Sequence, residues 1–320
     1  MMPNTFAPTI TIDAHHADHV GRRSAQQVLA TAFAATLVAL TATAGLAETS
    51  RSGTIVAGGA DYGYRISGEG SPLLLLHGGL MSYDSFDPIL PLLEESHEVI
   101  AVDLLGHGRT ALGTRSFDMA ELGADVGAIL TELGYDTVDV LGYSLGGGVA
   151  LQLALTDPER IDRMVLVSTT YSSDGFFPEI KQQQVAIGAD IAPMMAETPM
   201  YQNYAALAPV PEDFPRLLDE LGTVMRAEFD MSDFIETLEM PVMLVYGDSD
   251  MITPQHMIEF YALLGGGQQD GGWMGETMSR NRLAILPGLT HYNIFMSPAL
   301  AETSLGFINE TETATPATSN

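Results

Sequence analysis

No cysteine occurs in this chain of 320 residues, and lysine occurs once, as Lys181. The absence of cysteine excludes disulfide bonds, thiolate metal sites and a cysteine nucleophile. Basic residues are scarce as a class, because 13 Lys and Arg stand against 41 Asp and Glu and give a formal net charge of −28. A nucleic-acid-binding protein needs a basic surface to contact phosphates, so we expect no nucleic-acid partner. The oligomeric state is left open.

The first 47 residues differ from the rest of the chain. Arg22 and Arg23 precede the segment 28–47, which carries no charge and ends in small residues. A basic flank, an apolar stretch and a small-residue end are typical of an export signal. We therefore expect cleavage after Ala47 and export to the periplasm or the medium, by the general or the twin-arginine route. The alternative is an uncleaved membrane anchor, since 20 apolar residues can span a bilayer.

From residue 53 onward, short apolar runs alternate with helical patterns, which is typical of an α/β fold with a mostly parallel sheet flanked by helices. A helix is expected around 84–95, and further helices at 118–133 and from 145 to about 156. The expected strands are 53–57 and 62–67 (a hairpin), 72–76, 98–103, 137–141, 163–168, 242–246 and 283–286.

A long interval without a convincing strand follows the sixth expected strand, and its helical pieces are separated by prolines. Such a stretch within an α/β domain indicates an inserted cap. The predicted organisation is therefore an export signal at 1–47, a core formed by 48–170 and 239–310, a helical cap at 171–238 and a disordered tail at 311–320. Methionines and aromatic residues of the cap either form its own small core or line an apolar substrate pocket. We expect Met194 and Met195 to contact substrate.

Gly142-Tyr143-Ser144-Leu145-Gly146 has the pattern G-x-S-x-G between an expected strand and an expected helix. In this context the serine stands on a tight turn at the carboxyl edge of the sheet, where its hydroxyl is available as a nucleophile. The N–H of Leu145, at the start of the helix, is a candidate oxyanion donor. Tyr143, next to the nucleophile, is a candidate substrate contact.

A serine nucleophile needs a general base, and position eliminates most of the histidines. His291 follows the last expected strand, at the edge where Ser144 lies, whereas His256 is expected to be solvated in the first turn of a helix. The base in turn needs an orienting carboxylate. Asp250 stands a few residues beyond the preceding strand and is favoured over Asp248, which is nearer the strand end.

A second oxyanion donor is expected in the segment His77-Gly78-Gly79-Leu80, which follows the strand at 72–76. The N–H of Gly79 is favoured and that of Leu80 is the runner-up, with Leu80 also a candidate substrate contact. His77 is expected to be a structural hydrogen-bonding group, and the segment 103–109 a structural turn.

These motifs resemble those of α/β-hydrolase-fold enzymes over nearly all of residues 53–310. The segments that carry the resemblance are HGG at 77–79, DLLGHGR at 103–109, GYSLG at 142–146, GDSDMITP at 247–254 and LPGLTHYN at 286–293. The resemblance implies an eight-stranded, mostly parallel sheet with a cap after the sixth strand. Ser144 stands where haloalkane dehalogenases and epoxide hydrolases have Asp, and Leu80 replaces the third glycine of the HGGG run of hormone-sensitive-type lipases.

The sequence thus predicts a serine hydrolase that cleaves a small-molecule carboxylic ester through Ser144, His291 and Asp250, with no metal and no organic cofactor. A lactonase or macrolide-type esterase, or a hydrolase of C–C or amide bonds, would use the same three residues. A binding protein on an inactive hydrolase scaffold is the alternative of another class. Fold alone does not choose the substrate.

Overall fold

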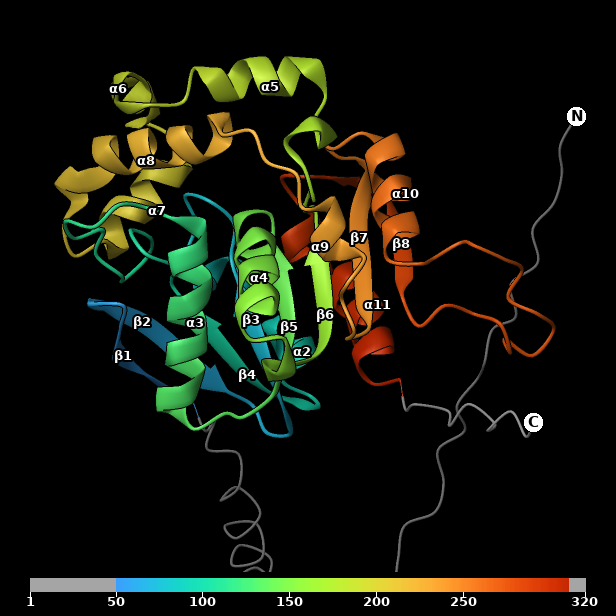
Figure 1. Ribbon diagram of the computed structural model, residues 1–320. Coiled ribbons are helices and arrows are strands. Elements are labelled where there is room, and N and C mark those ends of the chain that lie inside the picture. The colour runs from blue at the N-terminus through green and yellow to red at the C-terminus, as the bar shows by residue number, and fades with distance from the viewer. Residues whose placement is uncertain (1–49, 311–320) are drawn as a thin grey trace, which may run out of the picture. The chain divides into compact units, whose positions relative to one another are not determined.

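The computed structural model describes residues 50–310 of the chain (Figure 1). The predicted export signal at 1–47 and the predicted tail at 311–320 lie outside these residues. Among the described residues, no helix combines the length and the apolar character needed to cross a bilayer.

Eight strands form one sheet in the order β1-β2-β4-β3-β5-β6-β7-β8. The pairs β1–β2 and β2–β4 are antiparallel, and the pairs from β3–β4 to β7–β8 are parallel. The predicted mostly parallel, eight-stranded α/β architecture is therefore confirmed. The strands are β1 (Arg51–Ala57), β2 (Ala60–Ser67), β3 (Ser71–Leu76), β4 (His97–Val102), β5 (Val138–Tyr143), β6 (Ile161–Val167), β7 (Val242–Ser249) and β8 (Arg282–Thr290).

The central strands are covered on both faces, so they read as continuous apolar runs rather than as alternating ones. In β3, Leu74 and Leu76 belong to one hydrophobic core, and Leu73 and Leu75 to the other. The helices α3 (Met119–Leu133), α4 (Leu145–Thr156) and α10 (Pro254–Leu263) contribute to the first core. The helices α2 (Leu90–Leu93) and α11 (Pro298–Ile308) cover the opposite face (Figure 1).

Several expected elements differ in extent from the prediction, two of them by more than three residues. The helix expected around 84–95 is a 3₁₀ turn at Tyr83–Phe86 followed by the four-residue α2. Pro88 and Pro91 interrupt this segment, and proline disfavours a continuous helix because it lacks an N–H donor. The strand expected at 283–286 extends to Thr290, so that Ser249 of β7 pairs with Thr290 after an irregularity in the register.

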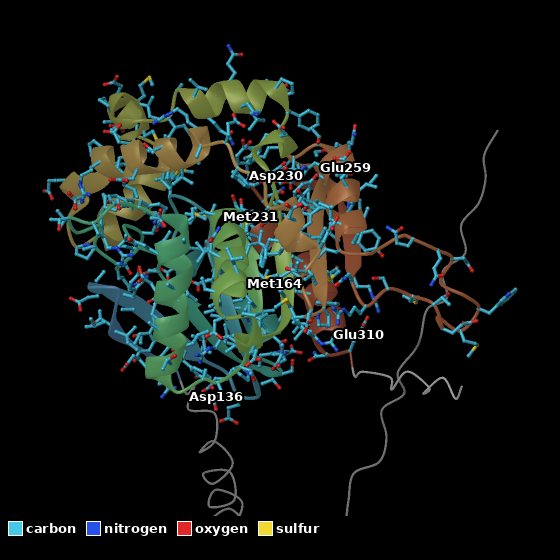
Figure 2. All side chains as sticks on the ribbon, in the orientation of Figure 1. Asp136, Met164, Asp230, Met231, Glu259 and Glu310 are labelled. Carbon is cyan, nitrogen blue, oxygen red and sulfur yellow. The ribbon has the colours of Figure 1, made fainter. Side chains whose placement is uncertain are left out.

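A helical insertion separates β6 from β7 and lies over the carboxyl edge of the sheet (Figure 1). It contains α5 (Pro178–Val185), α6 (Ala192–Met195), α7 (Pro199–Leu207) and α8 (Phe214–Arg226), and the short helix α9 (Ser232–Ile235) follows it before β7. Its two ends meet in a neck, which we define as residues 171–173 and 229–231. There Ser172 and Asp230 pair as an isolated antiparallel β-bridge, and the N–H of Met231 donates to the carbonyl of Tyr171 at 2.9 Å. Figure 2 shows Asp230 and Met231 below the insertion and next to α4.

Candidate active site

Ser144 occupies the turn between β5 and α4 with a φ of 52° and a ψ of −113°, a conformation that costs energy for a residue with a side chain. Close packing around the turn requires glycine on either side. A Cβ at Gly146 would lie 2.2 Å from the carbonyl oxygen of Leu76, and one at Gly142 would lie 2.6 Å from that of Gly146. The local sequence thus forces Ser144 outward at the start of α4.

The structure brings Ser144, His291 and Asp250 together from three strand ends. Ser144 follows β5, Asp250 follows β7 and His291 follows β8. His291 Nε2 lies 3.1 Å from Ser144 Oγ, and His291 Nδ1 lies 3.0 Å from Asp250 Oδ1. Both Asp250 and His291 are buried. With the proton on Nδ1, the imidazole can accept the serine proton on Nε2, which is the arrangement of a serine–histidine–aspartate triad.

The carboxylate of Asp250 is held on both oxygens. Oδ2 accepts hydrogen bonds from Ser168 Oγ at 2.5 Å and from the N–H of Gly247 at 3.4 Å, and Oδ1 also accepts from the N–H of Ile252 at 3.3 Å. Burial by itself would raise the pKa of Asp250, but the hydrogen bond and charge of His291, together with the Ser168 and Gly247 donors, hold it below its usual value. Asp250 therefore faces the histidine as an anion.

Two residues near Asp250 differ in their relation to the triad: Ser168 contacts it and was not predicted, whereas Asp248, the less favoured candidate carboxylate, does not contact His291. Ser168 is buried at the end of β6 and has a φ of 50°, and nothing in the sequence reveals either this conformation or its contact with Asp250. Its place at the carboxyl edge of a strand beside β5 was the one available signal. Asp248 is exposed and accepts a hydrogen bond from Ser249 Oγ at 3.3 Å, away from the histidine.

The three residues whose backbone N–H groups are candidate oxyanion donors border the same cavity as Ser144. Gly79, Leu80 and Leu145 all line this cavity. Leu80 has a φ of 59°, so the chain turns sharply just after Gly79. Leu145 is the first residue of α4, where N–H groups have no partner within the helix.

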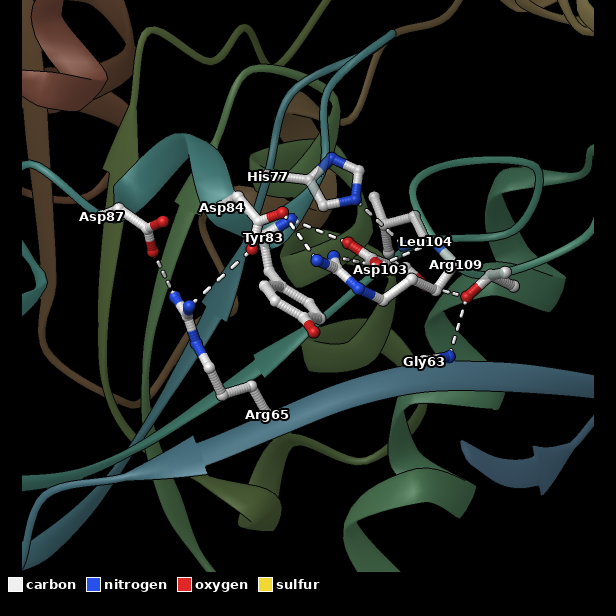
Figure 3. A network of polar contacts seen from close by, with 10 residues as sticks. Gly63, Arg65, His77, Tyr83, Asp84, Asp87, Asp103, Leu104 and Arg109 are labelled. Carbon is white, nitrogen blue, oxygen red and sulfur yellow. Dashed lines mark hydrogen bonds and ion pairs between the residues drawn. The ribbon is translucent and has the colours of Figure 1, made fainter. Parts of the chain in front are cut away.

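His77 anchors the loop that carries Gly79. Its Nδ1 donates to the carbonyl of Gly78 at 2.8 Å. Its Nε2 accepts from the N–H of Leu104 at 3.0 Å, as Figure 3 shows. Burial lowers the pKa of His77 to about 4, so the ring is neutral at neutral pH. Both ring nitrogens are thus used in backbone contacts, as expected for a structural histidine.

The turn that begins at Asp103 is organised by one buried carboxylate. Asp103 accepts from the N–H of Tyr83 at 2.7 Å and from the N–H of Arg109 at 2.8 Å, and the Arg109 guanidinium reaches Asp84 at 2.8 Å (Figure 3). A Cβ at Gly108 would lie 2.2 Å from Asp103 Cγ, so the turn requires glycine there. These contacts are those of a structural turn beside the site.

A cavity of about 750 Å³ opens above Ser144, between the core and the insertion. Of the two methionines expected to contact substrate, Met195 lines the cavity, whereas Met194 is 73% exposed and does not border it. Neighbouring residues on a helix point about 100° apart, and here Met195 is the one that faces inward. Tyr143 borders the cavity, and its hydroxyl donates to the backbone carbonyl of His291 at 2.6 Å. Its ring packs between His291 and Phe295.

His256 also differs from the prediction. It is buried rather than solvated, stacks on the ring of Tyr171 and accepts the N–H of Tyr171 on Nε2 at 3.3 Å. The insertion covers this first turn of α10, which a single sequence does not show. In the part of the chain that the structure describes, no cluster of three or more His, Asp or Glu side chains could hold a metal ion.

Comparisons with known proteins agree with this geometry. Residues 71–198 match the alpha/beta hydrolase fold family. A pimeloyl-[acyl-carrier protein] methyl ester esterase of Aeromonas hydrophila is 32% identical over 213 residues, which are 60% of this chain and 82% of the relative. A 2-hydroxymuconate semialdehyde hydrolase of Pseudomonas sp. is 26% identical over 229 residues, 62% of this chain and 77% of the relative.

Among solved structures, a carboxylesterase of Bacillus subtilis superposes with a TM-score of 0.61 at 17% identity, covering 88% of this chain and 98% of its own. At this identity the likeness concerns the fold alone. Together with the relative that is 32% identical over most of its length, these matches show that the chain belongs to the α/β-hydrolase-fold family, and its relatives there include a methyl ester esterase and a 2-hydroxymuconate semialdehyde hydrolase.

Proposed function

We propose that the protein is a carboxylic-ester hydrolase that works through an acyl-enzyme intermediate. The observation that carries the proposal is the continuous hydrogen-bond chain Ser144–His291–Asp250, which ends in an apolar cavity. His291 accepts the proton of Ser144 as Oγ attacks the ester carbonyl, and then protonates the leaving alkoxide. Asp250 stabilises the imidazolium that forms between these two transfers.

The N–H groups of Leu145 and Gly79 stabilise the oxyanion of the tetrahedral intermediate, with Leu80 as the alternative second donor. The strained backbone of Ser144 supports this role, because it aims the hydroxyl at the cavity while Leu145 begins a helix. Water activated by His291 then hydrolyses the acyl-enzyme. The step releases the acid and restores the serine.

Hydrolysis of p-nitrophenyl acetate by the wild-type protein and by Ser144→Ala tests the proposal. Loss of one essential member of such a triad reduces turnover by roughly 10⁶-fold. Equal turnover by the two proteins would refute the assignment. A fluorophosphonate probe gives a second readout: labelling of the wild type and not of Ser144→Ala is expected, and an unlabelled wild type would favour a binding protein on a hydrolase scaffold.

We also propose that the protein is exported, with cleavage after Ala47. The basic pair before an uncharged stretch with small residues at its end supports this. N-terminal sequencing of the protein recovered from the expressing cells and their medium tests it. A mature protein that begins at Glu48 outside the cytoplasm is expected, and full-length protein held in the membrane would favour the anchor instead.

A further inference from the structure

The cavity above Ser144 is walled by flexible apolar side chains from both parts of the fold. Seven methionines line it. Three come from the core (Met81, Met119 and Met251) and four from the insertion (Met195, Met200, Met225 and Met231). Methionine has three rotatable side-chain bonds and no branch, so a wall of methionines adapts to ligands of different shape. A volume of about 750 Å³ is within the range of pockets that enclose a whole small molecule.

The charges around the cavity are unfavourable for an anion. Of the described residues that line it, Lys181 is the one cation, and its Nζ lies 3.0 Å from Asp174 Oδ1 and 3.9 Å from Glu228 Oε1. Asp118 and Glu228 add carboxylates to the lining, and no arginine contributes to it. A substrate carboxylate that entered the cavity would therefore lose its hydration without gaining a free cationic partner, which is costly.

We infer that the substrate is an uncharged ester with a flexible apolar chain, and that the methionine-lined part of the cavity receives this chain. The inference rests on the proposed ester hydrolysis and adds the substrate class to it. It separates this protein from hydrolases whose substrates carry a carboxylate next to the reacting group. Burial of the apolar chain supplies the binding energy. Substrates with a carboxylate are disfavoured because their charge would lose its hydration in the cavity.

Two substrate series test the inference on the wild-type protein: p-nitrophenyl esters from acetate to decanoate, and alkyl acetates of increasing chain length. In at least one series, kcat/KM should rise about fourfold per added methylene until the cavity is filled, which corresponds to about 0.8 kcal/mol per buried methylene. Two flat profiles would overturn the inference.

A matched pair of substrates tests the charge. Methyl heptanoate should be hydrolysed with a kcat/KM at least about tenfold above that of monomethyl adipate, because the terminal carboxylate of the latter stays unpaired in the cavity. Equal values, or a preference for the adipate ester, would overturn the inference.

A pair of variants tests the wall formed by the insertion. Ile187 lines the cavity, whereas Val185, two residues before it, is 65% exposed and does not. Ile187→Trp should move the optimum to shorter chains, and Val185→Trp should keep the wild-type profile. If Ile187→Trp folds and keeps that profile too, the insertion does not receive the chain.

The failure of this inference is distinguishable from the failure of the proposed function. Absence of both acetate hydrolysis and fluorophosphonate labelling would refute ester hydrolysis itself. Hydrolysis that depends on Ser144 but ignores chain length and charge would leave the esterase in place and refute the substrate class.

Discussion

Ser168→Ala should lower both the stability of the protein and the activity of the proposed triad. The Ser168 hydroxyl donates to Asp250 Oδ2 at 2.5 Å, and the remaining donor to that oxygen, the N–H of Gly247, is 3.4 Å away. Removal of a hydrogen bond to a charged group costs about 1.5–3 kcal/mol, which corresponds to a fall in melting temperature of roughly 3–12 °C for a domain of this size. If the smaller value is also lost from transition-state stabilisation, kcat/KM falls about tenfold.

The pH dependence separates the contact with Asp250 from a general packing effect. The pKa of Asp250 is lowered in the folded protein, so its ionised form contributes stability above the unfolded-state pKa, and this contribution is lost as the pH falls through the folded-state value. The stability difference between wild type and Ser168→Ala should therefore be largest near neutral pH. It should shrink as the carboxylate is protonated.

Ser67 provides the matched control for this variant. It is buried like Ser168, but its Oγ has no hydrogen-bond partner among the described residues. Urea denaturation and ester kinetics of both alanine variants should show a loss for Ser168→Ala and little change for Ser67→Ala. Equal effects of the two substitutions, or a stability difference that does not vary with pH, would refute the reasoning.

Three further outcomes are expected. Asp250→Asn should lower kcat by roughly 10³–10⁴-fold, while Asp248→Asn, at an exposed position, should keep near wild-type kinetics; the reverse result would exchange their roles. Asp125→Ala should reduce the free energy of unfolding by about 3 kcal/mol in urea, because the Tyr62 hydroxyl and the Arg115 guanidinium lose their shared carboxylate, whereas a loss below 1 kcal/mol would contradict this. Unfolding free energy should fall as the pH is lowered from 6.5 toward 4, by up to about 3 kcal/mol per pH unit, because burial lowers the pKa of three histidines and the unfolded chain takes up these protons first. Burial also raises the pKa of Asp139 to about 7, so the folded protein binds one proton over the same range and offsets about one third of the effect; stability that is constant over this range would contradict the prediction. The three histidines are His77, His107 and His256, with pKa values of about 4, 3 and 4.

The fold could be predicted from the sequence because the strongest signals in the sequence are local. Continuous apolar runs of at least four residues, bounded by polar residues, predict strands that are covered on both faces, and β3 and β4 contain such runs. G-x-S-x-G between a strand and a helix places Ser144 at the carboxyl edge. The ends of parallel strands meet at that edge, so residues such as Asp250 and His291 could be expected near it.

The features that could not be predicted from the sequence depend on contacts with residues far along the chain. Met194 and Met195 are the same type of residue, and the orientation of the four-residue helix α6 about its axis decides which one faces the cavity. His256 looks solvated on its own helix, but the segment that follows β6 covers it. The hydrogen bond of Ser168 joins residues 82 positions apart, and its left-handed φ has no signature in the amino-acid type.

The neck of the insertion has a consequence for how such a protein diversifies. The strands on either side of the insertion, β6 and β7, pair directly in the sheet. At the neck, the segment that leaves the core (171–173) and the segment that returns to it (229–231) are hydrogen-bonded to each other. Everything beyond the neck can therefore be exchanged as one cassette by recombination, with the ends of the replacement already held together. The part of the cavity wall that the insertion supplies is then encoded separately from the three residues of the triad, so a change in that wall does not require a new reaction centre.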